Sequence, residues 1–410
     1  MHILVLNGGS SGLKAVLHKL NGDALPDRPP VPAWDAKVDW GRYPGKALIS
    51  IRKAGHTALE TEMKIQGADA VLDPVLQSLW DGPAKVLESK NQVDMVGHRV
   101  VHGGKSFRDT TRITPEVKKE IAKLAQYAPE HNRLELEAIE ATERDLGPDV
   151  PQVAVFDTAF HSTLSASAST YPGPYAWIDQ GIRRYGFHGI SHQYVSQRAA
   201  AILGRDLAGV RMVTCHLGNG ASLAAVLDGK SIDTTMGFTP LEGIMMGTRS
   251  GSIDPGIIIH LVRNCGYGAD QLDHILNKES GLLGLSGVSG DMREVLAAIE
   301  KGDARAKLAF DVYVHRLCGS ICAMTASLGG LDALVFTAGI GENCPPLRDR
   351  VCQQLSFLGI KLGTAANDDS PVDKDIAEPG SPVRVIVAHT DEDWAIAREC
   401  VRLLNGKPTR

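Results

Sequence analysis

The hydrophobic pattern of the chain is dominated by two similar stretches. Residues 2–19 read HILVLNGGSSGLKAVLHK, and residues 212–229 read MVTCHLGNGASLAAVLDG. In each stretch an apolar run leads through Asn, Gly and Ser into a second apolar run, which predicts a β-hairpin. Closely spaced glycines also let backbone N–H groups converge on a phosphate. Because the pattern occurs twice, we expect a duplicated domain with a nucleotide held between the two halves.

The remaining segments alternate between strand-like and helix-like patterns. Proline-rich residues 21–46 predict an irregular surface excursion. Helical spacing is present in residues 56–90, in residues 115–146 with a break at 128–132, near 257–279, in 291–330 and in 394–404. Apolar strands are expected at 93–104, 151–161, 331–339 and 383–388, and a long loop at 231–256. Strands alternating with helices after an opening hairpin predict an α/β fold with mixed sheets.

Composition narrows the class of protein. A chain of 410 residues exceeds what one core usually supports, so we expect two domains. The net charge of −5 and the sequence pI near 6.3 argue against a nucleic-acid surface or an anionic-membrane binder. There is no secretory leader and no run of apolar residues long enough to span a bilayer, so we expect a cytoplasmic protein. The seven cysteines are expected to be buried free thiols.

Charged side chains stand at the predicted strand ends, where active sites of α/β proteins lie. Asn7 and Lys14 flank the first loop, and a plain hairpin with a surface lysine is the alternative. Arg99 lies in apolar surroundings, where a guanidinium needs either an anionic ligand or a structural ion pair. Asp157 ends a buried strand and suits either a metal-holding carboxylate or a helix cap. Arg249 lies in a glycine-rich loop with several hydroxyls, which is typical of a functional loop.

Further candidates follow from local patterns. His188, in YGFHGISH, could donate to a phosphoryl oxygen; with His192 it also allows a metal site, for which no third ligand stands nearby. Glu392, taken alone, reads as the solvated start of a helix. Residues 337–343 (TAGIGEN) read as a glycine turn suited to adenine and ribose. The chain has neither a Walker GxxxxGK[ST] motif nor the kinase HRD and DFG motifs, which excludes those two nucleotide-binding classes.

Taken together, these segments resemble the acetate kinase family, which has the actin-like, sugar-kinase-like ATPase fold. The matching segments follow the family order over nearly the whole chain: NGGSSGLK (7–14), GHRVVHGG (97–104), VFDTAFH (155–161), YGFHGISH (185–192), HLGNG (216–220), MGFTPLEG (236–243), MGTRSGSIDP (246–255), FTAGIGEN (336–343) and EDWAIAR (392–398). The resemblance implies two ribonuclease-H-like domains with a nucleotide cleft between them. Residues 1–158 with 394–410 would form the first, and residues 159–393 the second, with the nucleotide-binding and dimerisation surfaces.

The resemblance also implies the activity: transfer of the γ-phosphoryl group of ATP to a short-chain carboxylate, with Mg²⁺ or Mn²⁺. A carboxylate is already ionised at neutral pH, so direct in-line attack on phosphorus needs no strong base. The implied catalytic residues are Asn7, Arg99, Asp157, His188, Arg249 and Glu392. Of these, Asn7, Asp157 and Glu392 would organise the metal, and Arg99 and Arg249 would bind the carboxylate and the phosphoryl group.

Further positions carry over to the nucleotide and to the acid. The nucleotide would meet Ser10, Lys14, His216, Asn219, Gly220, Asp291, Arg293, Gly339, Ile340 and Asn343. The acid would meet Arg99, Val101, Phe187 and Pro240. The implied partners are small molecules and a second copy of the chain in a homodimer, with neither nucleic acid nor a membrane.

The chain departs from the family pattern at three places. The first loop has Gly12 where the family usually has a third serine, which removes one hydroxyl near the phosphates. Glu130 begins the segment EHNRLE where the family has LHNPPN, so a carboxylate takes the place of a leucine of the methyl pocket. The usual Asn-Asp-Phe-Arg nucleotide segment reads GDMR at 290–293.

These departures leave alternatives open. Glu130 either turns outward, towards Arg133 for example, or makes the pocket suit an acid more polar than acetate; propionate is a further candidate, and butyrate fits less well because it needs more apolar room. Pyrophosphate could replace ATP as donor. An actin-like ATPase that changes shape on hydrolysis shares the fold, but it would give Arg99 and Arg249 no purpose. A non-catalytic binding protein is disfavoured by the intact catalytic positions.

Overall fold

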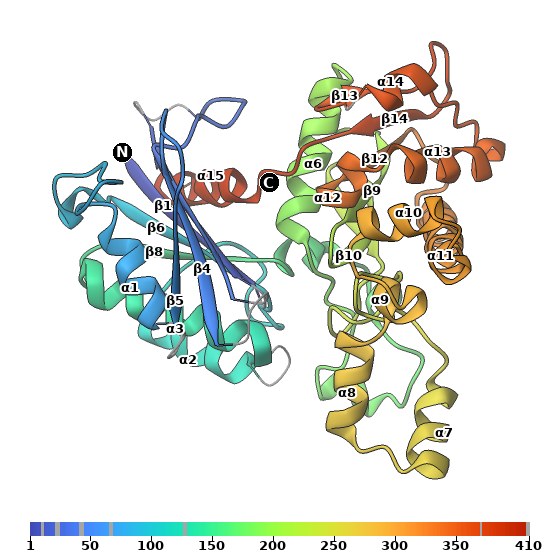
Figure 1. Cartoon of the computed structure of the whole chain (residues 1–410), viewed down its shortest axis with the longest axis horizontal. Helices are drawn as coiled ribbons and strands as arrows, with labels where there is room; N and C mark the ends of the chain where they lie inside the picture. The colour runs from blue at the N-terminus through green and yellow to red at the C-terminus, as the bar shows by residue number, and fades with distance from the viewer. Residues whose placement is uncertain are drawn as a thin grey trace. The chain divides into compact units, whose positions relative to one another are not determined.

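The computed structural model describes residues 1–9, 12–20, 25–40, 45–64, 69–125, 129–369 and 371–406, with the backbone alone at 69–70 and 129–131. The chain divides into two compact units: Met1–Ala159 with Asp391–Arg410, and Phe160–Thr390. Both contain a sheet and helices (Figure 1). The expected α/β class with mixed sheets is therefore confirmed. The first unit also includes Ala159 and residues 391–393, which the sequence prediction assigns to the second domain.

The first unit is built on an eight-stranded sheet in the order β5-β4-β3-β2-β1-β6-β8-β7. Its strands are β1 (His2–Gly9), β2 (Gly12–Lys19), β3 (Trp34–Asp39), β4 (Lys46–Lys53), β5 (Leu59–Lys64), β6 (Met95–Val100), β7 (Thr111–Arg112) and β8 (Gln152–Phe156). Strands β1 to β5 pair antiparallel, whereas β6 runs parallel to both β1 and β8. The expected hairpin at 2–19 is confirmed, with Asn7 opposite Lys14.

The second unit repeats this order around a six-stranded sheet, β11-β10-β9-β12-β14-β13. Its strands are β9 (Arg211–Leu217), β10 (Ala221–Leu227), β11 (Lys230–Thr234), β12 (Ala333–Thr337), β13 (Lys374–Asp375) and β14 (Arg384–Val387). Strands β11, β10 and β9 are antiparallel, and β12 is parallel to β9 and β14. The run β3-β2-β1-β6-β8 of the first unit thus has its counterpart in β11-β10-β9-β12-β14, as a duplicated domain requires.

Helices complete both units (Figure 1). The first unit holds α1 (Asp69–Gln77), η1 (Lys90–Gln92), α2 (Pro115–Leu124), α3 (Pro129–Leu146) and α15 (Glu392–Leu404). The short 3-10 helix η2 (Ala159–Thr163) begins at the last residue of the first unit before its break and continues into the second unit. The second unit holds α4 (Ala166–Ser169), α5 (Ala176–Asp179), α6 (Gly189–Ile202), α7 (Pro255–Cys265), α8 (Ala269–Lys278), α9 (Gly281–Ser286), α10 (Met292–Glu300), α11 (Ala304–Leu328), α12 (Ala338–Asn343), α13 (Pro345–Gln354), η3 (Ser356–Leu358) and α14 (Thr364–Asp368). No described helix is long and apolar enough to cross a membrane.

Several sequence predictions were wrong in detail. Residues 21–46 are not wholly irregular, because β3 lies within them and its Trp34, Ala36 and Val38 face the core. Part of the expected helical region 56–90 is strand β5, whose side chains are almost all exposed. Residues 338–343 form the short helix α12 rather than a turn. The seven cysteines are free, as expected, but they are not all buried: Cys322 is half-buried and Cys265 is exposed.

The last helix completes the core of the first unit. Trp394 and Ile396 of α15 are fully buried. Helix α15 packs closely on β6 at Gly97, where a methyl group would lie 2.6 Å from Cγ2 of Ile396 and 2.7 Å from Sγ of Cys400. Only a residue without a side chain allows this approach. The same packing brings the first residues of α15 to the carboxyl end of β1.

We therefore predict that Gly97→Ala lowers the free energy of unfolding by about 1–3 kcal/mol, because the extra methyl overpacks a filled core. Urea unfolding followed by circular dichroism measures the change. Gly319→Ala is the control, since nothing lies within 4 Å of a methyl group on that residue of α11. It should leave stability unchanged or raise it by about 0.5–1 kcal/mol through helix propensity. Equal effects of the two substitutions would contradict the close approach of α15 and β6.

Candidate active site

Arg99 and Asp157 form the central ion pair of the first unit. Arg99 lies near the end of β6, and Asp157 follows the last residue of β8, so the parallel strands bring both side chains to one edge of the sheet. Nε and Nη2 of Arg99 donate to Oδ2 of Asp157 at 3.0 and 2.5 Å, and Nη1 donates to the Gly8 carbonyl at 2.9 Å. Burial would lower the pKa of Arg99, but Asp157 and Glu392 raise it above its ordinary value. The guanidinium is thus fixed in position and stays charged.

The start of α15 adds a second polar cluster beside the first hairpin. Nδ2 of Asn7 donates to Oε2 of Glu392 at 3.1 Å and to Oδ1 of Asp393 at 3.2 Å. Lys14, opposite Asn7 in the hairpin, forms an ion pair with Asp393. Burial raises the pKa of Glu392, and Arg99 opposes that rise. Glu392 is therefore no solvated helix start but a half-buried carboxylate turned towards Asn7.

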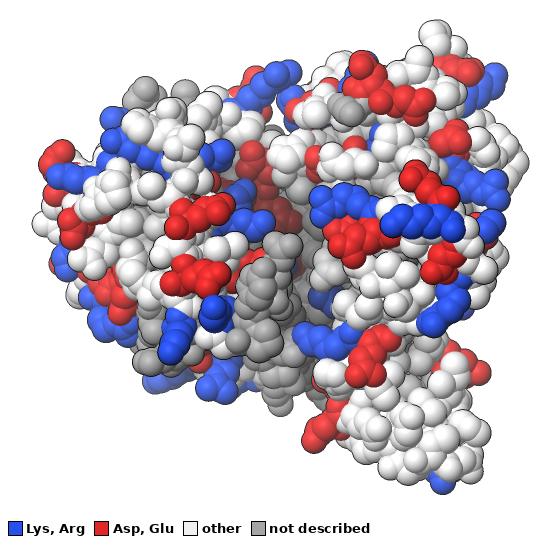
Figure 2. Space-filling model, viewed as in Figure 1, with Lys and Arg blue, Asp and Glu red and all other residues white. Residues whose placement is uncertain are grey.

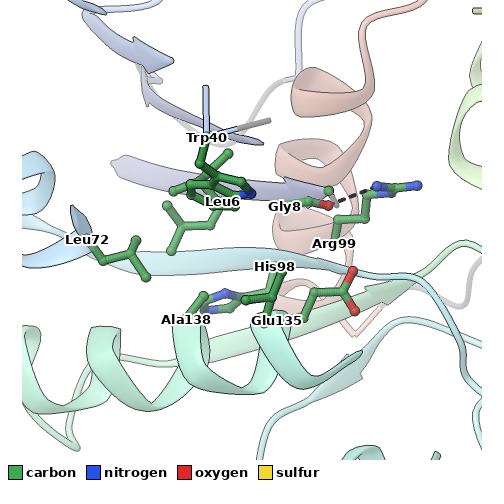
Figure 3. A pocket seen from close by; sticks show the side chains of 11 residues that line it. Leu6, Gly8, Trp40, Leu72, His98, Arg99, Glu135 and Ala138 are labelled. Carbon is green, nitrogen blue, oxygen red and sulfur yellow. Dashed lines mark hydrogen bonds between the residues drawn. The ribbon is translucent and has the colours of Figure 1, made fainter. Parts of the chain in front are cut away.

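A buried glutamate of α3 adds a further carboxyl group near Arg99. Glu135 is 4% exposed, and its Oε2 accepts a hydrogen bond from the Val101 N–H at 3.0 Å. Its Oε1 and the Oδ1 of Asp157 are buried without a described partner. Burial raises the pKa of Glu135 to about 8, although Arg99 and the Val101 N–H lower it. Figure 3 shows the carboxyl group at a small cavity that Arg99 also lines.

That cavity is too small for a substrate. Its volume is about 20 Å³, room for one water molecule. Leu6, Trp40, Leu72 and Ala138 make most of its lining apolar, and the side chain of His98 also lines it (Figure 3). An isolated polar group in such surroundings is costly to desolvate, which is why the environment favours the protonated form of the Glu135 carboxyl.

The residues of the first unit suit a hard cation. Asn7, Asp157 and Glu392 supply amide and carboxylate oxygens, the ligand type that Mg²⁺ prefers. The unpartnered Oδ1 of Asp157 is an acceptor that a cation or its hydration shell would satisfy. Among the described residues no group of three or more His, Cys, Asp or Glu side chains could by itself hold a metal. Mg²⁺ is usually held by one or two carboxylates together with the phosphates of a nucleotide.

In the second unit, two histidines stack at the glycine-rich hairpin. The rings of His188 and His216 lie 4.2 Å apart, nearly parallel. His188 precedes α6 with φ +57°, a left-handed conformation that is rare for a residue with a side chain and marks a constrained position. Nδ1 of His188 contacts Oγ of Ser222 at 2.9 Å, and Nδ1 of His216 contacts Oγ of Ser191 at 2.7 Å.

Arg249 reaches the same hairpin from the glycine-rich loop. A methyl group on Gly220 would lie 3.4 Å from Nε2 of His188 and 3.5 Å from Nη1 of Arg249, so the bare glycine leaves space beside both. Nη1 of Arg249 donates to the Pro240 carbonyl at 3.0 Å, and the Gly247 N–H donates to the Asn219 carbonyl at 3.0 Å. The structure therefore brings together the candidate residues His188, His216, Asn219, Gly220 and Arg249.

The second unit also contains a larger cavity of about 430 Å³. This volume is within the range of small-molecule sites. The predicted nucleoside residues that line it are Asn219, Asp291, Arg293, Gly339, Ile340 and Asn343. Asp291 caps α10 by accepting the Arg293 N–H at 2.9 Å, and the two side chains form an ion pair at 2.5 Å. Nδ2 of Asn343 donates to the Gly339 carbonyl at 3.0 Å, which braces α12.

The remaining candidates are divided between the units or fall outside the described residues. Val101, 3% exposed, is in the first unit, whereas Phe187, 1% exposed, and the half-buried Pro240 are in the second. Ser10 and the side chain of Glu130 lie outside the described residues.

Sequence reasoning missed three contributors. Asp393 stands next to a candidate residue, and its acidic side chain was a usable signal. Glu135 lies in a segment already singled out, but nothing local shows that it faces inward. Ser222 is part of a hairpin, and its contact with His188 joins residues far apart in the chain.

Comparison with known proteins gives one consistent family. Residues 2–398 match the model of the acetokinase family. The acetate kinase of Gloeobacter violaceus is 58% identical over 402 residues, 98% of this chain and 98% of that protein. The acetate kinase of Trichormus variabilis is 56% identical over 405 residues, 99% of this chain and 100% of that protein.

Solved structures agree. The crystal structure of Porphyromonas gingivalis acetate kinase has a TM-score of 0.89 at 39% identity, covering 98% of this chain and 99% of that one. A propionate kinase from Francisella tularensis subsp. tularensis SCHU S4 has a TM-score of 0.87 at 36% identity, covering 97% and 98%. The resemblance seen in the sequence motifs is thereby confirmed over the full length.

Glu135 generates a prediction about pH. Its raised pKa means that the unfolded chain binds fewer protons than the folded protein between about pH 4.5 and pH 8, so its contribution to stability is lost as the pH rises through that window. Glu135→Gln keeps an acceptor for the Val101 N–H and carries no charge. The stability of this variant relative to the wild type should therefore increase from pH 5 to pH 8.

Urea unfolding at three pH values in this window tests the prediction. Glu137→Gln, which removes a helix-surface partner of Arg133, is the control and should show a nearly constant difference. A Glu135→Gln difference that is flat or shrinks with rising pH would show that the carboxyl is ionised in the folded protein.

Proposed function

The chain belongs to the acetokinase family, and we propose that it transfers the γ-phosphoryl group of ATP reversibly to acetate, giving acetyl phosphate and ADP. The observation that carries this most directly is the guanidinium of Arg99, which Asp157 and the Gly8 carbonyl hold in a fixed position. A preorganised cation at the end of a strand suits an anionic substrate.

Positioning and charge neutralisation supply the chemistry in this proposal. An acetate oxygen attacks the γ-phosphorus directly, and the bond to the bridging oxygen of ADP breaks. Arg99 and Arg249 bind the carboxylate and the equatorial phosphoryl oxygens. His188 donates a hydrogen bond to a phosphoryl oxygen. Transfer requires that the residue sets of both units act on the same pair of substrates.

Asn7 and Glu392 would hold Mg²⁺, with Asp157 organising the ion and its water. The ion supplies charge neutralisation of the nucleotide phosphates when it is bound. Lys14 and the backbone of the first hairpin would contact the phosphates, and so would His216, Asn219 and Gly220. Mn²⁺ has the same preference for oxygen ligands and is the expected substitute.

The 430 Å³ cavity favours a nucleotide over pyrophosphate as donor. Its lining by Gly339, Ile340 and the Asp291–Arg293 pair offers flat backbone surface and polar groups for adenine and ribose. Pyrophosphate has neither adenine nor ribose, so it would leave this cavity without a ligand. ATP as co-substrate and free thiols both fit a reducing cytoplasm, where we place the activity.

Acetate is the acid that we favour, on the strength of the full-length relatives. The propionate kinase of Francisella shares the fold closely, so the fold does not distinguish one added methylene. Val101 is held through its backbone by the buried Glu135, an arrangement that gives this part of the pocket a fixed wall.

The second unit offers a surface for a homodimer. Helix α7 has no buried residue, and Ile257, Ile259 and Val262 are 46%, 51% and 48% exposed. The surface over this helix is largely uncharged (Figure 2). Clustered exposed aliphatic side chains mark an interaction surface. We propose that two copies associate through α7.

Acyl phosphate trapped as hydroxamate tests the activity. With ATP and Mg²⁺ we expect strong product formation from acetate, weaker formation from propionate, and little from butyrate, glycolate or lactate. Arg99→Gln should lower kcat/KM by about 10²–10³-fold, because a preorganised cation is lost. Arg52→Gln, which breaks the exposed pair with Asp35, is the control and should remain active.

Other outcomes separate the alternatives. Turnover confined to glycolate and lactate would place Glu130 inside the pocket and favour a kinase of polar acids. Activity with pyrophosphate in place of ATP would contradict the proposal that ATP is the phosphoryl donor. ATP hydrolysis without acyl phosphate from any acid would contradict the kinase and support the conformational ATPase.

Light scattering tests the dimer. We expect the wild type at twice the chain mass, and a variant carrying both Ile257→Asp and Ile259→Asp at the mass of a single chain, because the new charges cannot be buried at an apolar interface. Val31→Asp, at an exposed position of the first unit, is the control and should remain a dimer. A dimer that survives both charges in α7 would place the interface elsewhere.

A further inference from the structure

A line of hydrogen-bonding side chains runs from His188 into the core of the second unit. Nδ1 of His188 contacts Oγ of Ser222 at 2.9 Å, and the same oxygen contacts Nε2 of His192 at 2.8 Å. Nδ1 of His192 then contacts Oγ1 of Thr214 at 2.8 Å. His192, Ser222 and Thr214 are each fully buried.

His192, in the interior of this line, carries a single ring proton when it is neutral. Both ring nitrogens of His192 face hydroxyl groups and neither faces a carboxylate. Burial lowers the pKa of His192 well below its ordinary value, and His161 and His216 add to that effect. A neutral imidazole has one N–H and one acceptor nitrogen, so the proton on His192 points either to Thr214 or to Ser222.

The Thr214 hydroxyl decides between the two directions. Its proton can go to Nδ1 of His192 at 2.8 Å or to the Ala224 carbonyl at 3.4 Å. The distance to the Ala224 carbonyl is longer than that of an ordinary O–H···O hydrogen bond, so the Thr214 hydroxyl donates to Nδ1 of His192. His192 then donates through Nε2 to Ser222. The Ser222 hydroxyl, with its oxygen already accepting from His192, donates to Nδ1 of His188.

We propose that Thr214, His192 and Ser222 are positioning residues that keep Nδ1 of His188 an acceptor, so that neutral His188 carries its proton on Nε2. The proposal rests on the proposed contact of His188 with a phosphoryl oxygen. It means that His188 can donate this hydrogen bond without carrying a positive charge. With the opposite polarity, only a protonated, charged His188 could donate from Nε2.

The surroundings of His188 make a neutral donor useful. The neighbours of His188 include the stacked His216 of β9, the Ser222 hydroxyl of β10 and Arg249 of the glycine-rich loop, with His192 of α6 on the other side of Ser222. Arg249 already brings a positive charge beside Gly220. A second cation there would be repelled, and it would be lost at alkaline pH.

A neighbouring pair shows the same arrangement with its direction fixed by a carbonyl. Nε2 of His161 lies 3.0 Å from the Phe187 carbonyl, which can only accept, and its Nδ1 lies 2.7 Å from Oγ of Ser231. With one proton on the ring, His161 donates from Nε2 to this carbonyl, and Ser231 then donates to Nδ1. This Ser–His pair does not include His188, so it provides a matched control.

Nitrogen NMR of the wild-type protein, labelled with ¹⁵N-histidine, tests the proposal directly. Long-range ¹H–¹⁵N spectra distinguish a protonated from an unprotonated ring nitrogen, and His188→Asn identifies the signals of His188. At a pH of about 8 we expect Nε2 of His188 to be protonated and Nδ1 unprotonated. The reverse pattern overturns the proposal, whether or not the protein makes acyl phosphate, so failure here is distinct from failure of the proposed function.

Kinetics separate positioning from a purely structural contribution. Ser222→Ala should lower kcat about tenfold, a part of the loss expected when a whole donor is removed, and leave both KM values within about twofold. Ser231→Ala removes a comparable buried hydrogen bond, so it should lower thermal stability similarly and leave kcat within about twofold of wild type. Equal loss of kcat in both variants would overturn the proposal.

The pH dependence gives a third readout. Because the donor is neutral, wild-type kcat should not fall between about pH 6.5 and pH 8.5 through loss of a proton from His188. A fall across this range in the wild type that is absent in His188→Asn would show that His188 donates only when charged, and would overturn the proposal.

Discussion

The ion pair of Arg99 and Asp157 is the interaction on which the candidate site residues of the first unit depend. Both residues stand where parallel strands end, and a buried guanidinium without its carboxylate would be strongly destabilising. Once the pair is in place, its positive charge allows Glu392 and Glu135 to lie near it. The carboxylates are thus tolerated because one cation stands among them, and their oxygens are the ligand type that suits a hard metal ion.

The duplicated topology places different chemistry at equivalent positions. In both units the first hairpin is followed by parallel strands, and in both the glycine-rich turn leads into the candidate site. In the first unit the turn is accompanied by carboxylates and a lysine. In the second it is accompanied by stacked histidines and Arg249. One backbone plan therefore supplies an acidic half-site suited to a metal and a basic, hydroxyl-lined half-site suited to phosphate.

Much of this could be predicted from the sequence, because motif residues stand at fixed places in regular elements. The two hairpins, the strand before Asp157 and the last helix were all correctly predicted from apolar runs. Strand β3 was missed because prolines precede it, although Trp34, Ala36 and Val38 alternate towards the core. Strand β5 has almost no buried side chain, so its pairing with β4 leaves no hydrophobic pattern to detect.

What the sequence could not supply are contacts between distant segments, and they decide the chemistry at the site. Glu135 is one charged residue among several on α3, and only packing turns it inward towards Arg99. Ser222 and Thr214 read as ordinary strand residues, yet their hydroxyls meet His192 and His188 from two neighbouring strands. A hydroxyl has one proton to give, so its nearest acceptor determines the protonation pattern of the rings beyond it. The protonation pattern that we propose for His188 therefore depends on Ser222 and Thr214, which lie outside the motifs.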